Sequence, residues 1–254
     1  MDQTQAIQER FGAAAERYAV STVHRGGPDL DAMLAAGVRT GRERVLDVGC
    51  GPGATALAFA ARTASVVALD LTPAMLEQAR HEAQARGLAN LRFELGNAAQ
   101  LPFPDASFEL VTSRLAAHHV AEPQAMVRGV ARVLAPGGLF LLSDTIAPED
   151  PARDTFLNAF EVLRDPSHVR DHRVSEWQAM FQDAGLAPSC LLRFDIHQEF
   201  APWVARIGTA PDAVTGLRAL CDAAPDEVRG HFAIRAHGEY AFRLDGAVLL
   251  GVRR

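Results

Sequence analysis

Three glycines near the start of the chain have the spacing of a nucleotide-binding turn. Gly49, Gly51 and Gly53 stand at alternate positions directly after residues 45–48, an apolar run rich enough in β-branched side chains to be a buried strand. Residues 55–61 then read as a helix. Glycines let the backbone approach a ligand closely, and a helix start offers unpaired N–H groups to it. The stretch therefore predicts a nucleotide-binding crevice.

The spacing of these glycines also distinguishes between nucleotides. A dinucleotide fingerprint needs the spacing G-x-G-x-x-G, whereas this loop has G-x-G-x-G, with Ala54 where the third fingerprint glycine would fall. Asp47 stands two residues before the first glycine, where a carboxylate would repel a pyrophosphate but attract an ammonium group. An NAD-dependent oxidoreductase is therefore kept only as a rival interpretation.

The segment from Asp47 to Gly53, which includes Cys50, resembles the first motif of class I S-adenosylmethionine (SAM) methyltransferases. In that family the glycine loop passes under the methionine part of SAM. Residues 101–108 also match the loop entering the fourth strand in the branch that contains ubiquinone and menaquinone C-methyltransferases, and residues 132–138 are a further family hallmark. The resemblance implies SAM as the cofactor and S-adenosylhomocysteine as the product.

A second acid ends the next predicted strand. Residues 65–70 read as a buried strand, and its last residue, Asp70, lies about 20 residues past the glycine loop, as a βαβ unit dictates. A carboxylate there can accept both hydrogen bonds of a ribose diol. A helix-capping role for Asp70 is the alternative, but Thr72 can cap the following helix instead. Leu71 and Met75 are expected to be walls for the adenine.

The third predicted strand, residues 91–95, leads to Asn97 and Ala98. Family members commonly carry an aspartate at the position of Asn97, and its carboxylate takes the adenine amino group. The amide oxygen of Asn97 can accept the same hydrogen bond, without charge assistance. We also expect cofactor contacts from Cys50, from Ala98 and from Ser113 at the end of the fourth strand.

Candidate catalytic residues follow this fourth strand, residues 108–113. Arg114, His118 and His119 stand at its carboxyl end, where a doubly wound sheet binds its ligands. An imidazole titrates near neutrality, so either histidine is a candidate for deprotonating or orienting a nucleophile. Packing against the adenine or capping the next helix is the alternative for each. Adjacent side chains diverge, so we do not expect the two to act on one atom. Arg114 is a candidate substrate contact.

Helical segments outside this core are expected to cover the ligands. We divide a single methyltransferase domain, residues 1–254, into an N-terminal helical lid at 1–40, a SAM-binding core at 41–145, and helical cap elements at 146–187 and 200–240. The lid follows from resemblance to small-molecule methyltransferases and would supply Tyr18 and His24 to the cofactor. Plain packing of these amphipathic helices on the sheet is an equal alternative.

The first cap element carries two histidines and two arginines. His168 and His172 are four residues apart, a spacing that can chelate a metal on one helix face. No third ligand has a sensible spacing, and Arg170 and Arg173 add positive charge, so we expect no metal. A polar cap wall, or an arginine pair that binds an acidic or carbonyl substrate, is favoured, which makes His168 and Arg170 candidate substrate contacts. Trp203, in the second cap element, is either a substrate wall or a packing residue.

The composition narrows the class of partner. A formal net charge of −6 and the absence of a Lys/Arg run argue against nucleic acid and fit a neutral or cationic small substrate better. No stretch approaches the ~20 apolar residues of a membrane helix, and the N-terminus lacks a signal-peptide pattern. Three cysteines without pairing or metal-ligand spacing favour a reducing cytoplasm. The sequence leaves homodimer formation open.

These observations predict an α/β fold with a doubly wound, mostly parallel seven-stranded sheet and helical cap insertions. The expected activity is transfer of a methyl group from SAM to a small-molecule acceptor by direct in-line displacement, which requires alignment and exclusion of water. The alternative is a SAM-binding sensor, or an enzyme that uses SAM without methylating, because the cofactor residues would be the same.

Overall fold

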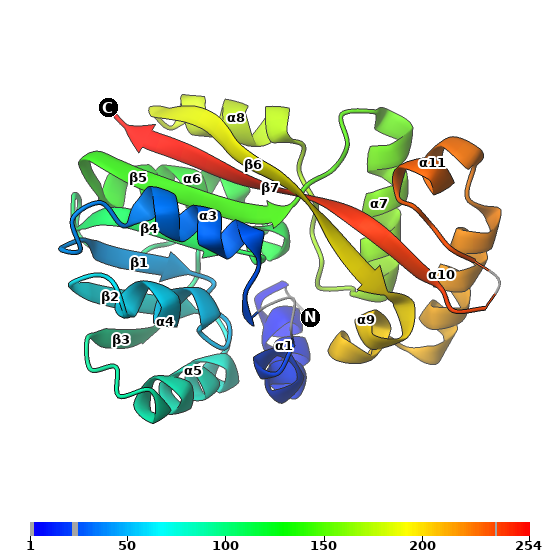
Figure 1. Cartoon of the computed structure of the whole chain (residues 1–254), viewed down its shortest axis with the longest axis horizontal. Helices are drawn as coiled ribbons and strands as arrows, with labels where there is room; N and C mark the ends of the chain where they lie inside the picture. Colours follow the sequence, from blue (N-terminus) through cyan, green and yellow to red (C-terminus); the bar gives the residue numbers. More distant parts are fainter. Residues whose placement is uncertain (1–2, 22–24, 237) are drawn as a thin grey trace.

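Seven strands form one mixed sheet in a computed structural model that describes residues 3–21, 25–236 and 238–254 (Figure 1). Their order across the sheet is β3-β2-β1-β4-β5-β7-β6, and β7 runs antiparallel to the other six strands. The predicted fold class is confirmed. The strands are β1 (Arg44–Val48), β2 (Ser65–Asp70), β3 (Leu91–Leu95), β4 (Phe108–Arg114), β5 (Leu134–Thr145), β6 (Leu186–Glu199) and β7 (Ala241–Arg253).

Helices cover both faces of the sheet. Apolar residues alternate along β1, so that Val45 packs in one core with α3, α4 and α5, while Leu46 packs in the opposite core with α6 and α8. The helices are α1 (Gln3–Ala19), α3 (Pro28–Gly37), α4 (Ala54–Ala60), α5 (Pro73–Ala85), the 3₁₀ turn η1 (Ala117–His119), α6 (Pro123–Val133), α7 (Pro151–Arg164), α8 (Val174–Asp183), α9 (Phe200–Ile207), α10 (Pro211–Ala223) and α11 (Asp226–His231).

The strand order reverses at β1, which pairs in parallel with β2 on one side and β4 on the other. A crevice forms outside the carboxyl ends of parallel strands at such a reversal, because the connections leave in opposite directions. The loops after β1, β2 and β4 therefore meet at one edge of the sheet. Helix α1 lies across this edge, in contact with both α5 and α9 (Figure 1).

Strands β6 and β7 form a long antiparallel ribbon that extends past the rest of the sheet (Figure 1). Strand β5 accompanies β7 only from Gly246 to Val252, whereas β6 pairs with it as far as Glu199 opposite Ala241. The far end of the ribbon packs with α7, α9, α10 and α11 in a second hydrophobic cluster, which includes Phe160 and Trp203. The cap therefore has its own core.

Helix α8 lies within the expected first cap element but packs on the sheet. Its buried side chains, Trp177 and Phe181, pack into the core under β5 and β7 rather than into the second cluster. The cause is its apolar face, which matches the open side of the sheet next to α6. None of the helices in the described ranges is long and apolar enough to cross a membrane.

A buried ion pair fastens α3 to the end of β4. Asp29 binds Arg114 through two contacts, of 2.5 Å to Nε and 3.1 Å to a terminal nitrogen, and the side chains are only 3% and 4% exposed. The Ser143 hydroxyl donates a further hydrogen bond to Asp29. Removal of one member would leave the other charge buried without its partner, which is costly.

We expect Asp29→Ala to lower the free energy of unfolding by about 3–5 kcal/mol. Urea denaturation measures the loss, and Asp31→Ala, at an exposed position of the same helix, is the matched control. The double variant Asp29→Leu/Arg114→Met should recover much of the loss, because an apolar pair leaves no charge unpaired. Equal stability of Asp29→Ala and Asp31→Ala would contradict this account.

Candidate active site

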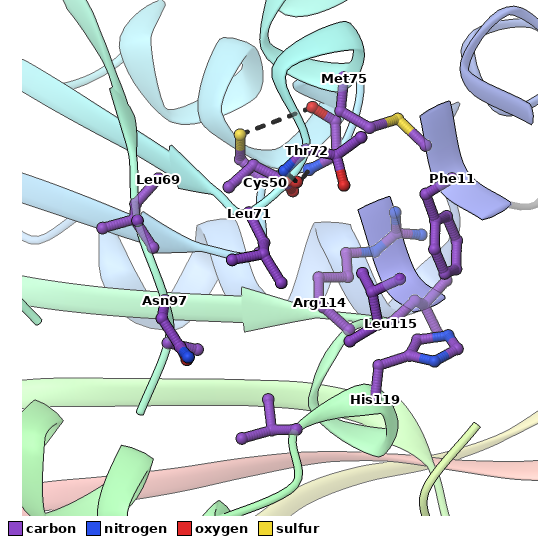
Figure 2. A pocket seen from close by; sticks show the side chains of 18 of the residues that line it. Phe11, Cys50, Leu69, Leu71, Thr72, Met75, Asn97, Arg114, Leu115 and His119 are labelled. Carbon is purple, nitrogen blue, oxygen red and sulfur yellow. Dashed lines mark hydrogen bonds between the residues drawn. The ribbon is translucent and has the colours of Figure 1, made fainter. Parts of the chain in front are cut away.

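A cleft of about 1160 Å³, open solvent at its mouth included, lies at the carboxyl edge of the sheet. Its walls come from the glycine loop, the start of α5, the segment after β3, η1 and helix α1. Figure 2 shows Leu71 and Met75 on one side and His119 on the other, with Phe11 of α1 next to the histidine. The rings of Phe11 and His119 meet edge to face at 4.8 Å.

The glycine loop has the conformation that its spacing predicts. Gly49, Gly51 and Gly53 have φ values of +70°, +52° and +94°, a left-handed region that favours glycine. A Cβ on Gly49 would lie 2.7 Å from Ala116, and one on Gly53 would lie 2.9 Å from Ala79. One on Gly51 would meet nothing within 4 Å. Gly51 and Gly49 line the cleft, whereas Gly53 fits the helix against its neighbour.

Asp70 links the glycine loop to the start of α5. One carboxyl oxygen accepts from the N–H of Gly51 at 2.7 Å, and the other accepts from the N–H of Thr72 at 2.8 Å. Thr72 is the N-cap residue of α5, as expected, but its side chain makes no cap bond, and Asp70 accepts from its N–H instead. Burial raises the pKa of Asp70. Each oxygen still has a lone pair to offer, so the carboxylate fits a ribose diol as well.

Asp47 lies beneath the glycine loop, not in the cleft. Its side chain is buried, the residue is 1% exposed, and one oxygen accepts from the Thr112 hydroxyl at 2.7 Å. Burial raises the pKa of Asp47 to about 7. The expected direct contact with an ammonium group is therefore corrected, because Asp47 does not line the cleft and instead links β1 to β4 through Thr112. Ser113 is buried in the same way and is not among the residues that line the cleft.

Six of the other expected cofactor contacts line the cleft. Its walls include the side chains of Cys50, Leu71, Met75, Ala98, Asn97 and Tyr18. The amide oxygen of Asn97 already accepts from the Ala99 N–H at 2.9 Å, which leaves one lone pair for an adenine. His24 lies outside the described residues. Sequence reasoning missed Ile7 and Phe11 as cleft residues, although their helical spacing marks the apolar face of α1.

A second cavity, of about 510 Å³ with open solvent at its mouth included, adjoins the cleft on the side of the cap. Phe11, Tyr18, Leu115 and His119 line both spaces and so form the boundary between them. The second cavity is walled by side chains from η1, α7, α9, β6 and β7. Polar and charged groups are frequent among them, in contrast to the mostly apolar cleft wall of α1 and α5.

His119 is held in one protonation form at this boundary. Its Nδ1 lies 3.0 Å from the Ser167 carbonyl oxygen, which can only accept, so Nδ1 carries the hydrogen and Nε2 has a free lone pair. Burial, together with the neighbouring His118 charge, lowers the pKa of His119 to about 4. The ring is therefore a neutral imidazole at pH 7, with a basic nitrogen available to a reacting group.

His118 is charged, in contrast to the neutral His119. Burial alone would lower the pKa of His118, but the Asp144 carboxylate, 2.6 Å from Nδ1, outweighs it and raises that pKa to about 9. The ring is thus an imidazolium at neutral pH. The expected divergence of the two histidines is wrong, because the 3₁₀ turn places their ring centroids 4.3 Å apart. Their charge states, rather than their directions, separate their roles.

The expected substrate contacts of the first cap element are not in either cavity wall. His168 is buried against His118 at a ring distance of 5.5 Å, and burial lowers the pKa of His168 to about 2. Arg170 and Arg173 bind one carboxylate oxygen of Asp154, at 2.9 and 2.6 Å. The arginine pair is therefore occupied by the protein itself.

Two other expected substrate contacts do line a cavity. Arg114 lines the cleft with its guanidinium held by Asp29. Trp203 packs against Phe160 in the cap core, at a ring distance of 5.0 Å, and also lines the second cavity. Its role as a substrate wall stays a prediction.

Comparison with known proteins agrees with this cleft. A family model described as a methyltransferase domain matches residues 46–142. The uncharacterised methyltransferase YcgJ of Bacillus subtilis is 40% identical over 247 residues, which are 96% of this chain and 98% of the relative. Its crystal structure covers 89% of this chain and 98% of its own, with a TM-score of 0.87. A demethylmenaquinone methyltransferase of Deinococcus radiodurans is 37% identical over 153 residues, 58% of this chain and 63% of that relative.

The fold and the cleft define a nucleotide-binding enzyme of the doubly wound α/β class. The chain belongs to the class I SAM-dependent methyltransferases, similar to the branch with the menaquinone enzymes, and SAM is its cofactor. The expected family, activity and cofactor are confirmed.

We expect Asp70→Asn to weaken binding of S-adenosylhomocysteine by about 1–3 kcal/mol, because an amide leaves one acceptor oxygen for the loop and the ribose together. Isothermal calorimetry measures the change, with the exposed Asp183→Asn as the control. Thermal melting shows whether each variant is folded. An affinity equal to that of the control would remove Asp70 from the cofactor site.

The ring nitrogens of the two histidines should give different ¹⁵N NMR signals. At pH 7 we expect His119 to be protonated on Nδ1 only and to remain so at pH 5, because its pKa is lowered to about 4. His118 should be protonated on both nitrogens at pH 7 and lose a proton only near pH 9. The variants His118→Asn and His119→Asn assign the signals. Titration of both rings near pH 6.5 would contradict the charge states.

Proposed function

We propose that the protein methylates a small molecule that is held in the second cavity, with His119 as the general base. One observation carries the proposal: His119 stands on the boundary between the cofactor cleft and the second cavity, with Nε2 unprotonated. A proton acceptor in that position can take the proton of a nucleophile in the second cavity while the methyl donor lies in the cleft.

Bound SAM supplies an electrophilic methyl carbon, so the protein needs no covalent intermediate. The residues of the chain have to align the acceptor, exclude water and take its proton. His119 takes the proton at Nε2. His118, held as a cation by Asp144, keeps His119 neutral before the reaction and can favour negative charge on the acceptor.

Helix α1 acts in this proposal as the lid. Gln8 donates to the Leu71 carbonyl at 3.0 Å on the cofactor side, and Gln3 donates to the Ser167 carbonyl at 2.6 Å, beside His119. Arg17 donates to the carbonyl of Arg206 in the cap at 2.8 Å. These three bonds attach one helix to both cavities, so that its opening would admit ligands and its closure would exclude water.

The partner and the compartment are also proposals. A small molecule as partner is supported by the second cavity next to the cleft and by the negative net charge, which disfavours nucleic acid. A cytoplasmic location is supported by Cys50, Cys190 and Cys221, which are all free thiols. Homodimer formation stays a prediction.

Methyl-labelled SAM and a panel of small metabolites test the proposal. We expect label to enter at least one panel member with release of S-adenosylhomocysteine. His119→Asn should lower kcat about 10²–10⁴-fold, because asparagine can still donate to Ser167 but lacks the basic nitrogen.

The matched control is the exposed histidine variant His81→Asn, which should behave like the wild type. Binding of S-adenosylhomocysteine should be similar in all three proteins. Binding of SAM without label transfer to any acceptor would favour the sensor or non-methylating alternative. An unchanged kcat for His119→Asn would remove that residue from the reaction.

A further inference from the structure

Most charges around the second cavity have a partner within the protein. Among the described residues, His118 is paired with Asp144 at 2.6 Å, and Arg164 is paired with Glu161 at 3.4 Å. These groups therefore have little charge to offer a ligand. Two further ionisable side chains line the same cavity, Asp171 and Arg206, and neither forms an ion pair of this kind, although the charge of His118 acts on Asp171 from nearby.

Asp171 is buried without a hydrogen-bond partner. The residue is 1% exposed, and neither carboxyl oxygen has a hydrogen-bond partner among the described residues. The ring nitrogen of His168 lies 3.9 Å away, beyond hydrogen-bond distance, and that ring is uncharged because its pKa is lowered. Burial raises the pKa of Asp171 well above its usual value. A buried carboxyl group without a partner is destabilising, and a donor supplied by a ligand in the cavity would satisfy it.

Arg206 is the unmatched cation. Its guanidinium has one contact in the described part of the chain, a long hydrogen bond of 3.5 Å to the Gln198 side chain, and no carboxylate within ion-pair distance. Burial lowers the pKa of Arg206, which nevertheless remains charged. The planar guanidinium suits a carboxylate or another oxyanion.

The rest of the wall is apolar. Leu115, Ile196, Trp203 and Leu244 line the same cavity. Their side chains suit the hydrocarbon frame of a ligand, while the two unmatched groups and His119 suit three polar points on it.

We propose that the methyl acceptor is a small hydroxy acid, whose carboxylate binds Arg206, whose hydrogen-bond donor pairs with Asp171, and whose acidic hydroxyl faces His119. This inference rests on the proposed function. It differs from the neutral or cationic substrate that the net charge of −6 favours, because the local charges of a cavity, not the sum over the chain, select its ligand.

A base of lowered pKa favours a hydroxyl over an ammonium group. An ammonium group would not give its proton to such a weak base, whereas a hydroxyl becomes strongly acidic as its oxygen is methylated. The acceptor oxygen forms a bond to the methyl carbon and its proton passes to Nε2 of His119. The electron pair of the broken S–CH₃ bond stays on sulfur, S-adenosylhomocysteine leaves, and His119 releases the proton to solvent.

Calorimetry on the protein saturated with S-adenosylhomocysteine tests this chemistry. The probes are dihydroxybenzoates, which carry the carboxylate and two hydroxyl groups, each next to its primary amide, which removes the charge and keeps the shape. Monohydroxybenzoates and aliphatic 2-hydroxy acids, which lack the second donor, serve as comparisons. We expect at least one acid to bind about tenfold or more tightly than its amide. Arg206→Gln should abolish that difference, whereas the exposed Arg193→Gln should preserve it.

Asp171→Asn tests the second contact. We expect this variant to lower the affinity for the acid and for its amide alike, by about five- to tenfold, because both ligands use the same donor group to bind residue 171. The melting temperature of the ligand-free variant should be equal to or above that of the wild type, since the buried carboxyl is relieved. A structural role for Asp171 would instead lower the melting temperature.

The outcomes separate the two proposals. Acids that bind no better than amides, or a panel in which nothing binds, would overturn the hydroxy-acid inference while cofactor binding stays intact. Affinity for S-adenosylhomocysteine should change less than twofold in Asp171→Asn and Arg206→Gln, because neither residue lines the cofactor cleft. Label transfer from SAM to an uncharged acceptor would support the proposed methyl transfer and refute only the inference that the acceptor is an acid.

Discussion

The carboxylate of Asp70 is the interaction on which the cofactor edge depends. It joins the end of β2 to the N–H of Gly51 in the loop after β1 and to the N–H of Thr72 at the start of α5. Three segments that meet at the reversal of strand order are thereby fixed by one buried group. The left-handed backbone of the loop, which only glycine adopts easily, is stabilised by the bond from Gly51 to Asp70.

Beyond this edge, burial and neighbouring charge set the chemistry. Asp144 makes His118 a cation, and that cation disfavours protonation of His119 and His168. Three histidine rings within about 6 Å of one another thus carry one charge among them, as like-charge repulsion in a poorly solvated site requires. The low basicity of His119 is a consequence of this arrangement rather than of the residue itself.

Local patterns predicted the cofactor half of the site well. Gly49, Gly51 and Asp70 follow strands directly, so their positions follow from the strands and the turn. The assignments that failed are those where a partner from another element decides the role: Thr112 binds Asp47, and Asp154 binds Arg170. The second cavity was not predictable in the same way, because Asp171, Gln198 and Arg206 are brought together only by the packing of the cap. Asp144, which charges His118, could have been predicted, because it lies near the carboxyl end of the parallel strand β5, as Asp70 does in β2.

The ribbon of β6 and β7 has a further consequence. Residues 200–240 leave the ribbon at Glu199 and return at Ala241, which pair with each other across the two strands. The ends of the insertion are therefore adjacent, and a replacement of different length would add little entropic cost of loop closure. The length of this insertion can therefore change at little cost in loop closure, provided that its apolar face still fits the shared core with α7 and the ribbon.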